Sequence, residues 1–257
     1  MVSLTDIKTT KKTLTNLETE VLFIGIHKGR QLNSTEKALD NVLGGSLSRV
    51  IDVEKFNGKE KKELLCYGND EIKRVVIIGL GESKEYSTDV ARSIGSNITR
   101  YANLLMVSNF SVAGESFGLK KNNYAQAFAE GLTLGSYEFN NYKTKKEKDP
   151  KAEFVLVSGN INKKSLDKGL IIGLSVAFAR DLSNHPANIL TPSYLAKESK
   201  QIADAHPAME YTVFDGKEFK KMGMGAFHGV AMGATEPAKM IIVEYNGGHE
   251  TQKPIAL

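Results

Sequence analysis

The chain has 257 residues, of which 41% are hydrophobic and 25% are charged, enough for one large or two modest folded domains. Its net charge of +4 is a small excess, which disfavours nucleic acid as a partner. The longest apolar runs, such as residues 75–80, are too short to cross a bilayer, which argues against a membrane protein. No signal peptide is recognisable, and the single cysteine, Cys66, excludes a disulfide within the chain, so we expect a cytoplasmic protein and a buried, inert thiol.

Apolar runs and helical repeats alternate through the first part of the chain. Strands are predicted at residues 21–26, 64–67, 74–80, 104–107 and 154–157. The unbroken run at 75–78 predicts a central strand covered on both faces. Helices are predicted after Asn33, at residues 87–101 and from Asn122 or Asn123. This alternation predicts an α/β fold with a largely parallel sheet.

The first of these helices has recognisable ends. Asn33 and Glu36 have the spacing of a capping box, and Gly44 and Gly45 are expected to end or bend the helix. Its buried face is expected to consist of Leu39, Val42 and Leu43.

Residues 140–151 break the pattern, because they are rich in lysine and lack apolar periodicity. We interpret them as a solvated linker; a phosphate-binding basic patch is the alternative. The strand at 154–157 can return to the first sheet, and a helix at 166–182 can begin a second domain. The domains expected are therefore residues 1–160 and residues 161–257.

The remainder predicts a helix, a strand, a short helix and a buried strand. Thr191 is a good N-cap and Pro192 a good first helical residue. The apolar stripe of that helix consists of Leu195, Ala196, Ser199, Ile202 and Ala203. Residues 209–215 alternate like a half-buried strand, and Gly223 can end a helix at 217–222. Residues 240–243 are predicted to be buried on both faces.

Few residues have the pattern of a reactive centre. The five histidines form no metal-ligand pair, and the Gly79-Leu80-Gly81 turn lacks the third glycine of a dinucleotide fingerprint. No Gly-x-Ser-x-Gly motif is present. We interpret the polar segment 180–192 as a structural crossover rather than a substrate contact. Three methionines are interpreted as packing residues rather than ligands: Met222, Met224 and Met232.

Six short motifs in the last third of the chain occur in a recognisable order. They are Arg180-Asp181-Leu182, Asn184-x-Pro186-Ala187-Asn188, Leu190-Thr191-Pro192, Gly223-Met224-Gly225-Ala226, Glu236-Pro237 and Glu244-Tyr245-x-Gly247-Gly248. Together they resemble the entry to the catalytic domain of the leucine aminopeptidase (cytosol aminopeptidase) family. The earlier part resembles the family's N-terminal domain more loosely, through Leu39-Asp40, residues 44–47 and Gly79-Leu80-Gly81.

The resemblance implies a macro-like α/β N-terminal domain with a mixed sheet, followed by an α/β zinc-peptidase-like domain. It also implies a cytoplasmic homo-hexamer that removes N-terminal residues from peptides with two divalent metal ions, manganese or zinc. The family's metal-binding motif begins just after the segment matching residues 254–257. We therefore expect a truncated catalytic domain without catalytic, cofactor-binding or metal-binding residues, and a chain that is inactive alone and binds no metal.

Two other functions remain open from the sequence. The first domain could be a non-catalytic module that binds a nucleotide derivative or nucleic acid, although no interleaving of aromatic and basic residues supports this. The chain could also be an assembly or regulatory partner without catalysis.

Overall fold

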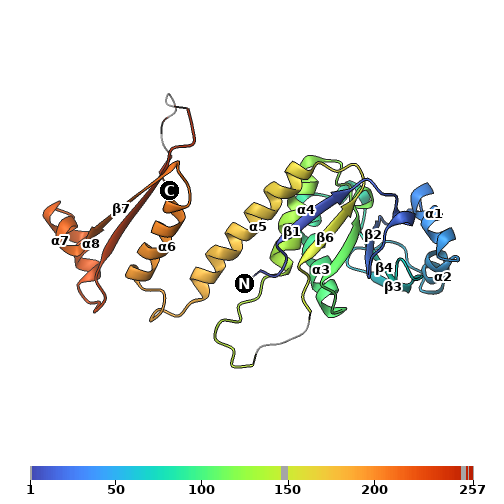
Figure 1. Cartoon of the computed structure of the whole chain (residues 1–257), viewed down its shortest axis with the longest axis horizontal. Coiled ribbons are helices and arrows are strands. Elements are labelled where there is room, and N and C mark those ends of the chain that lie inside the picture. Colours follow the sequence, from blue (N-terminus) through green and yellow to red (C-terminus); the bar gives the residue numbers. More distant parts are fainter. Residues whose placement is uncertain (1, 146–149, 250–252, 254, 257) are drawn as a thin grey trace. The chain divides into compact units, whose positions relative to one another are not determined.

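The computed structural model describes residues 2–145, 150–249, 253, 255 and 256 (Figure 1). Contacts between Cα atoms divide the chain into two compact units, Met1–Asp181 and Leu182–Leu257. Within the described ranges, no helix is both long and apolar enough to span a bilayer.

A six-stranded sheet forms the centre of the first unit. Its strands are β1 (Asp6–Thr10), β2 (Leu22–Ile26), β3 (Glu63–Tyr67), β4 (Arg74–Gly79), β5 (Asn109–Ala113) and β6 (Phe154–Ser158). Their order is β1-β6-β5-β2-β4-β3, and each neighbouring pair is parallel except β3 with β4. The predicted mixed and largely parallel sheet is confirmed.

Helices cover both faces of this sheet. They are α1 (Ser34–Val42), α2 (Ser46–Val53), α3 (Thr88–Leu104), α4 (Asn122–Gly135) and α5 (Lys163–Asn184), with short 3-10 helices η1 (Leu14–Asn16), η2 (Ser83–Glu85) and η3 (Gly114–Phe117). Strand alternation sends Phe23 and Val76 into the core with α3 and α4, and Leu22 and Val75 into the core with α1 and α2. Such central strands need apolar residues at every position, which explains the unbroken run in β4.

Glycines let α3 and α4 approach backbone to backbone. A Cβ added to Gly131 would lie 1.9 Å from the carbonyl oxygen of Arg92, and one added to Gly95 would lie 2.3 Å from that of Phe128. Helix α5 approaches α4 similarly, because a Cβ on Gly169 would lie 2.2 Å from the carbonyl oxygen of Gln126. Any larger side chain at these positions would push the helices apart.

Two predictions for the first unit are wrong. Val42 is 51% exposed, because the buried side of α1 follows Leu39 and Leu43. The strand predicted at 104–107 is the end of α3 and a turn, in which Met106 has a φ of 56°, and β5 begins only at Asn109.

The lysine-rich segment connects α4 to β6 inside one unit, so it does not join the two units. Residues 146–149 of that segment lie outside the described residues. Helix α5 belongs largely to the first unit, whereas the expected boundary at residues 160 and 161 precedes it. Compact units and evolutionary domains need not end at the same residue, so that boundary stays a prediction.

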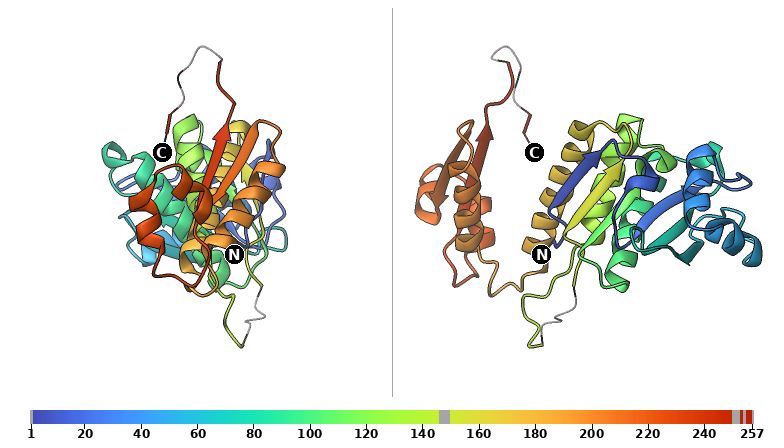
Figure 2. Two further views of the ribbon diagram at one scale, coloured as in Figure 1. Left: turned by 90° about the vertical axis from the view of Figure 1, so that its left-hand side faces the viewer. Right: turned by 45° about the vertical axis from the view of Figure 1, so that its right-hand side comes forward.

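The second unit contains α6 (Pro192–Asp204), β7 (Met209–Asp215), α7 (Gly216–Lys221), α8 (Gly225–Ala231) and β8 (Lys239–Tyr245). Strands β7 and β8 form a two-stranded antiparallel sheet, and α6 packs against both (Figure 2). The predicted cap of α6 is confirmed, since Thr191 Oγ1 accepts a hydrogen bond from the Tyr194 amide at 3.2 Å. Gly223 follows α7 with a φ of 79°, also as predicted.

The packing of this unit departs from the prediction. No described residue of β8 is buried, and Val243 is 43% exposed, so the expectation of a strand covered on both faces is wrong here. Only part of the predicted stripe on α6 is buried, namely Ala196 and Ala203, while Leu195 and Ile202 are more than a third exposed. A two-stranded sheet has too few neighbours to bury its apolar side chains. Residues 254 and 257, in the segment 254–257 that resembles the family, lie outside the described residues.

Candidate functional site

The first candidate is the edge of the large sheet where the parallel strands end. The chain runs from β2 to β4 on one side, then crosses to β5 and β6 on the other side. In open α/β sheets, ligands bind in the crevice created by such a reversal, which here lies between the ends of β2 and β5.

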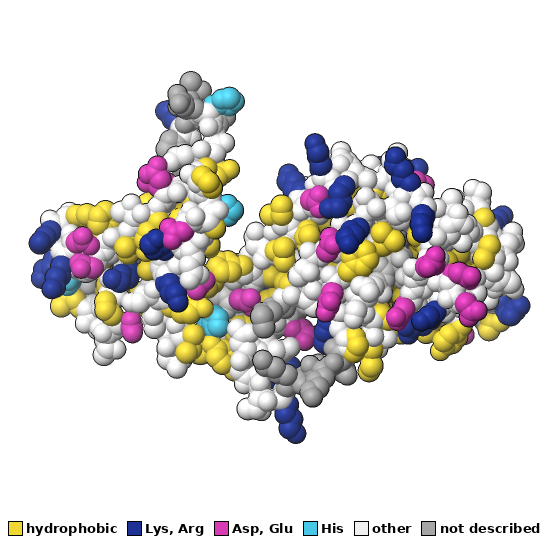
Figure 3. All heavy atoms as spheres, viewed as in Figure 1, with side chains coloured by type: hydrophobic (Ala, Val, Ile, Leu, Met, Phe, Trp, Pro, Cys, Tyr) yellow, Lys and Arg dark blue, Asp and Glu magenta, His cyan; other side chains and the backbone are white. Residues whose placement is uncertain are grey.

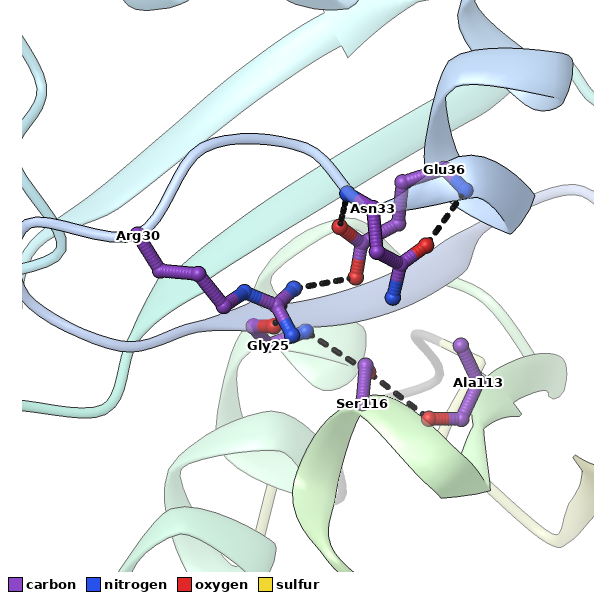
Figure 4. Close-up of polar contacts among 6 residues, drawn as sticks. All are labelled: Gly25, Arg30, Asn33, Glu36, Ala113 and Ser116. Carbon is purple, nitrogen blue, oxygen red and sulfur yellow. Dashed lines mark hydrogen bonds and ion pairs between the residues drawn. The ribbon is translucent and has the colours of Figure 1, made fainter. Parts of the chain in front are cut away.

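The protein's own side chains occupy this crevice (Figure 4). The amide of Gly25 in β2 donates to Ser116 Oγ at 2.9 Å, and Ser116 Oγ donates to the carbonyl oxygen of Ala113 at 2.7 Å. A Cβ on Gly25 would lie 2.9 Å from Leu80 and Phe117. The two strand ends are therefore joined by a buried serine hydroxyl, which uses the Gly25 amide and the Ala113 carbonyl oxygen. Among the described residues, the buried Arg30 Nε beside them has no hydrogen-bond partner.

An ion pair with a buried carboxylate lies beside the serine. Glu36 is 1% exposed, and its carboxylate accepts from Arg30 Nη2 at 2.5 Å and from the Asn33 amide at 2.9 Å. Asn33 Oδ1 accepts from the Glu36 amide at 2.9 Å, which completes the predicted capping box of α1. The same guanidinium nitrogen lies 3.4 Å from the carbonyl oxygen of Gly25. This cluster anchors the loop after β2 to α1 and uses the charges structurally.

The Gly79-Leu80-Gly81 turn is also structural, as predicted. A Cβ on Gly79 would lie 2.0 Å from the carbonyl oxygen of Lys59, and Gly81 has a φ of 71°. Glycine is therefore required by backbone proximity and by a left-handed conformation, without any phosphate.

Tyr86 follows this turn and is 9% exposed. Its hydroxyl donates to the carbonyl oxygen of Phe117 at 2.9 Å, and the hydroxyl of Tyr124 donates to the carbonyl oxygen of Tyr86 at 2.9 Å. Burial, with a smaller contribution from Tyr124, raises the pKa of Tyr86 well above its usual value. This phenol is a satisfied core group rather than an acid or base for catalysis at neutral pH.

Cys66 is buried in β3, as expected. Burial, with a smaller contribution from the charge of Asp40, raises the pKa of its thiol to about 11. The thiolate is the nucleophilic form, so a thiol with this pKa is inert near neutral pH.

The motif residues at the end of α5 make structural contacts. The hydroxyl of Tyr137 donates to Asp181 Oδ1 at 2.9 Å, and the Arg180 guanidinium lies 5.6 Å from the Tyr137 ring centroid. These contacts tie the end of α5 to the end of α4, which supports the interpretation of this segment as a structural crossover.

A cavity of about 380 Å³ in the second unit is lined in part by the Glu236-Pro237 motif. Its polar lining includes Asp215, Lys217, His228 and Glu236. Asp215 caps α7: the amides of Glu218 and Lys217 donate to its carboxylate, and these bonds lower its pKa. Met232 lines this cavity and is 73% exposed, and Met222 is 52% exposed, so the interpretation of these two methionines as packing residues is wrong for this structure.

The histidines and carboxylates of the described residues do not form a metal site. No three His, Cys, Asp or Glu side chains of the described chain converge as ligands. Instead, three histidines each contact an aromatic ring: His27 with Tyr86, His185 with Tyr194, and His228 with Phe219. The donor set that a divalent ion requires is not assembled in the described part of the chain, so no metal-dependent step can be derived from it.

Comparison with known proteins assigns the chain to a family. The model of the cytosol aminopeptidase family N-terminal domain matches residues 23–146, and the model of that family's catalytic domain matches residues 177–257. The match to the N-terminal domain precedes the match to the catalytic domain along the chain. The chain belongs to the cytosol aminopeptidase family.

Individual relatives agree with this assignment. The chain is 30% identical to a probable cytosol aminopeptidase of Alkaliphilus metalliredigens, over 95% of this chain and 51% of that protein. It is 32% identical to one of Sulfurihydrogenibium sp., over 93% of this chain and 49% of that protein. The chain therefore spans about half the length of the relatives it matches.

Solved structures share the fold. A mutant of tomato leucine aminopeptidase superposes with a TM-score of 0.83 and 27% identity, over 95% of this chain and 52% of that one. The bottromycin maturation enzyme BotP superposes with a TM-score of 0.69 and 21% identity, over 87% of this chain and 45% of that one. BotP has also been solved in complex with Mn, and the match covers 44% of the chain in that structure.

Proposed function

We propose that this chain is the N-terminal domain and the opening segment of the catalytic domain of a leucyl aminopeptidase-like enzyme. Such an enzyme removes N-terminal residues from peptides by two-metal hydrolysis. The observation that supports the proposal most directly is the superposition on tomato leucine aminopeptidase over 95% of this chain, combined with coverage of only 52% of that protein. The order of the two family matches supports it as well.

Two metal ions suit this chemistry, since they can polarise the scissile carbonyl and lower the pKa of a bound water. We propose manganese or zinc for the full-length protein. Because the described residues bring no three metal-ligating side chains together, we further propose that the 257-residue chain binds no catalytic metal and is inactive by itself.

Assays of the purified 257-residue chain test this proposal. With leucine amide as substrate and Mn²⁺ or Zn²⁺ added, we expect no release of leucine above the metal-only blank. After dialysis against buffer, elemental analysis should find far less than one metal ion per chain. Tomato leucine aminopeptidase serves as the positive control. Metal-dependent hydrolysis by the chain alone would contradict the proposal.

The proposal includes a cellular setting. The relatives are named cytosol aminopeptidases, and the single free cysteine is compatible with a reducing compartment, so we propose a cytoplasmic enzyme. We also propose that the full-length protein is a homo-hexamer acting on peptides with a free N-terminus. Its catalytic domain would begin at residue 161, with α5 as its first helix; this boundary lies between the N-terminal-domain match, which ends at residue 146, and the catalytic-domain match, which begins at residue 177.

The alternative, a nucleotide- or nucleic-acid-binding module, is not favoured. The crevice between β2 and β5 is filled by Ser116 and lies beside the Arg30–Glu36 pair. On the face of the first unit that Figure 3 shows, Lys and Arg side chains are interspersed with Asp and Glu rather than gathered into one patch. A phosphate backbone is bound by concentrated positive charge.

A further inference from the structure

Another cavity lies at the opposite edge of the large sheet, where the parallel strands begin. It has a volume of about 610 Å³, within the range of small-molecule sites. Its rim carries four carboxylates: Glu18, Glu20, Asp70 and Glu71. The starts of β5 and β6 form its floor. We call this cavity the acidic trough.

A buried hydroxyl faces the trough from its floor. Phe154 and Leu156 of β6 line the trough, whereas Val155 between them points into the core with α3 and α4. Ser111 of β5 also lines the trough and is paired with Leu156 in parallel register, so its side chain stands on the same face. Ser111 is 2% exposed, and among the described residues its hydroxyl has no hydrogen-bond partner. The described buried polar atoms without a partner are Ser3 Oγ and Arg30 Nε, so the Ser111 hydroxyl is open to the trough and available to a ligand there.

The charge of the trough opposes that of the chain. The chain carries a net charge of +4, yet within the described lining only Lys73 is basic against four carboxylates. Glu20 lies 3.7 Å from Arg74, and the carboxylates of Glu18, Asp70 and Glu71 form no ion pair with a described residue. Negative charge concentrated over a concave surface attracts cations.

The arrangement selects among cations. No three carboxylates of the described residues converge on one point, so the trough lacks the compact oxygen cage that a divalent metal needs. Carboxylates spread along a rim suit a longer molecule with several separated positive charges. An apolar floor accommodates the methylene groups between those charges, and a hydroxyl oxygen accepts a hydrogen bond from an ammonium group. Lys8 Nζ already lies 4.8 Å from the Phe154 ring centroid, which shows an ammonium group over part of this floor.

We propose that the acidic trough binds an alkylammonium ligand, with its charges between the rim carboxylates and one ammonium group donating to Ser111 Oγ. The same chemistry occurs in a free polyamine and in the lysine side chains of a basic peptide. The proposal concerns the first unit alone and does not depend on peptidase activity.

Calorimetric titration of the 257-residue chain with spermidine, and separately with an acetylated tetralysine amide, tests the proposal at low and at physiological salt. We expect saturable binding of at least one probe, weaker at the higher salt concentration. Replacing two rim carboxylates, Glu18→Gln with Glu71→Gln, should lower the affinity about fivefold, as expected for two exposed ion pairs. Binding of spermidine alone would identify a polyamine site, and binding of the peptide alone would identify a peptide site.

Two further variants distinguish a specific binding site from nonspecific electrostatic attraction of a cation to surface carboxylates. Asp52→Asn with Glu54→Gln removes the same charge from exposed positions on and just after α2, and should change the affinity less than twofold. Ser111→Ala should lower the affinity about threefold while leaving the thermal midpoint unchanged, because the hydroxyl makes no hydrogen bond to a described residue. No binding of either probe, equal losses in the two charge variants, or unchanged affinity in Ser111→Ala would overturn the proposal.

Discussion

Gly131→Ala is expected to destabilise the first unit by about 3 kcal/mol, one of the two largest effects expected here. The added Cβ would lie 1.9 Å from the carbonyl oxygen of Arg92, and it would also meet the carbonyl carbon and Cα of that residue within 3.0 Å. Backbone atoms within α3 cannot rotate away, so the two helices must separate. For a unit of this size, the loss corresponds to a fall of roughly 10 °C in the thermal midpoint, measurable by circular dichroism.

Gly229→Ala is the matched control. It makes the same chemical change in a helix, but the added Cβ would meet no atom within 4 Å. Alanine favours a helix over glycine by about 0.5–1 kcal/mol, so this variant should be neutral or slightly stabilising. If Gly131→Ala melted like the wild type, the close approach of α3 and α4 would not hold these helices in place.

Local signals explain why much of the first unit was predictable. Two features depend only on residues close together in the sequence, and both were predicted correctly. They are the capping box at Asn33 and Glu36 and the buried run in β4. The strand order was not predictable, because apolar runs do not reveal which strands pair. The strand predicted at 104–107 was wrong because the apolar residues at the end of α3 resemble the start of a strand. Only the turn at Met106 separates them from β5.

In the second unit, burial could not be predicted from local sequence. The apolar run at Met240–Val243 predicts burial on both faces, but burial requires partners that the sequence of the run does not contain. In the described structure β8 pairs only with β7, and its apolar side chains stay partly exposed. The motifs that indicated the family were nevertheless informative, because a profile of the catalytic domain matches this same region.

The candidate sites were harder to predict than the fold. Cys66 and the Gly79-Leu80-Gly81 turn were correctly predicted to be structural from their local context. The acidic trough was missed, because its carboxylates come from two loops about fifty residues apart and its hydroxyl comes from a third element. No spacing rule connects such residues before the register of β5 and β6 is known.

Arg30→Ala is the second substitution with a large expected effect. It leaves the Glu36 carboxylate, which is 1% exposed, without its cation, and removing one partner of a buried pair is strongly destabilising. Because the Arg30 side chain is 33% exposed, water screens part of the interaction, so we expect a loss of about 2 kcal/mol in chemical denaturation rather than the full value for a buried pair. Arg49→Ala, an exposed arginine of α2 without an ion pair among the described residues, should change stability by less than about 0.5 kcal/mol.

A double-mutant cycle shows whether the loss comes from the uncompensated charge. Glu36→Gln keeps the shape of the side chain but removes its charge, so Arg30→Ala should cost less in that background than in the wild type. We expect a coupling free energy of about 1–2 kcal/mol between the two residues, within the range for contacting charged groups. Additive losses would mean that Arg30 acts by filling space beside Gly25 and Ser116. Coupling would mean that the charge of Arg30 compensates the buried carboxylate of Glu36.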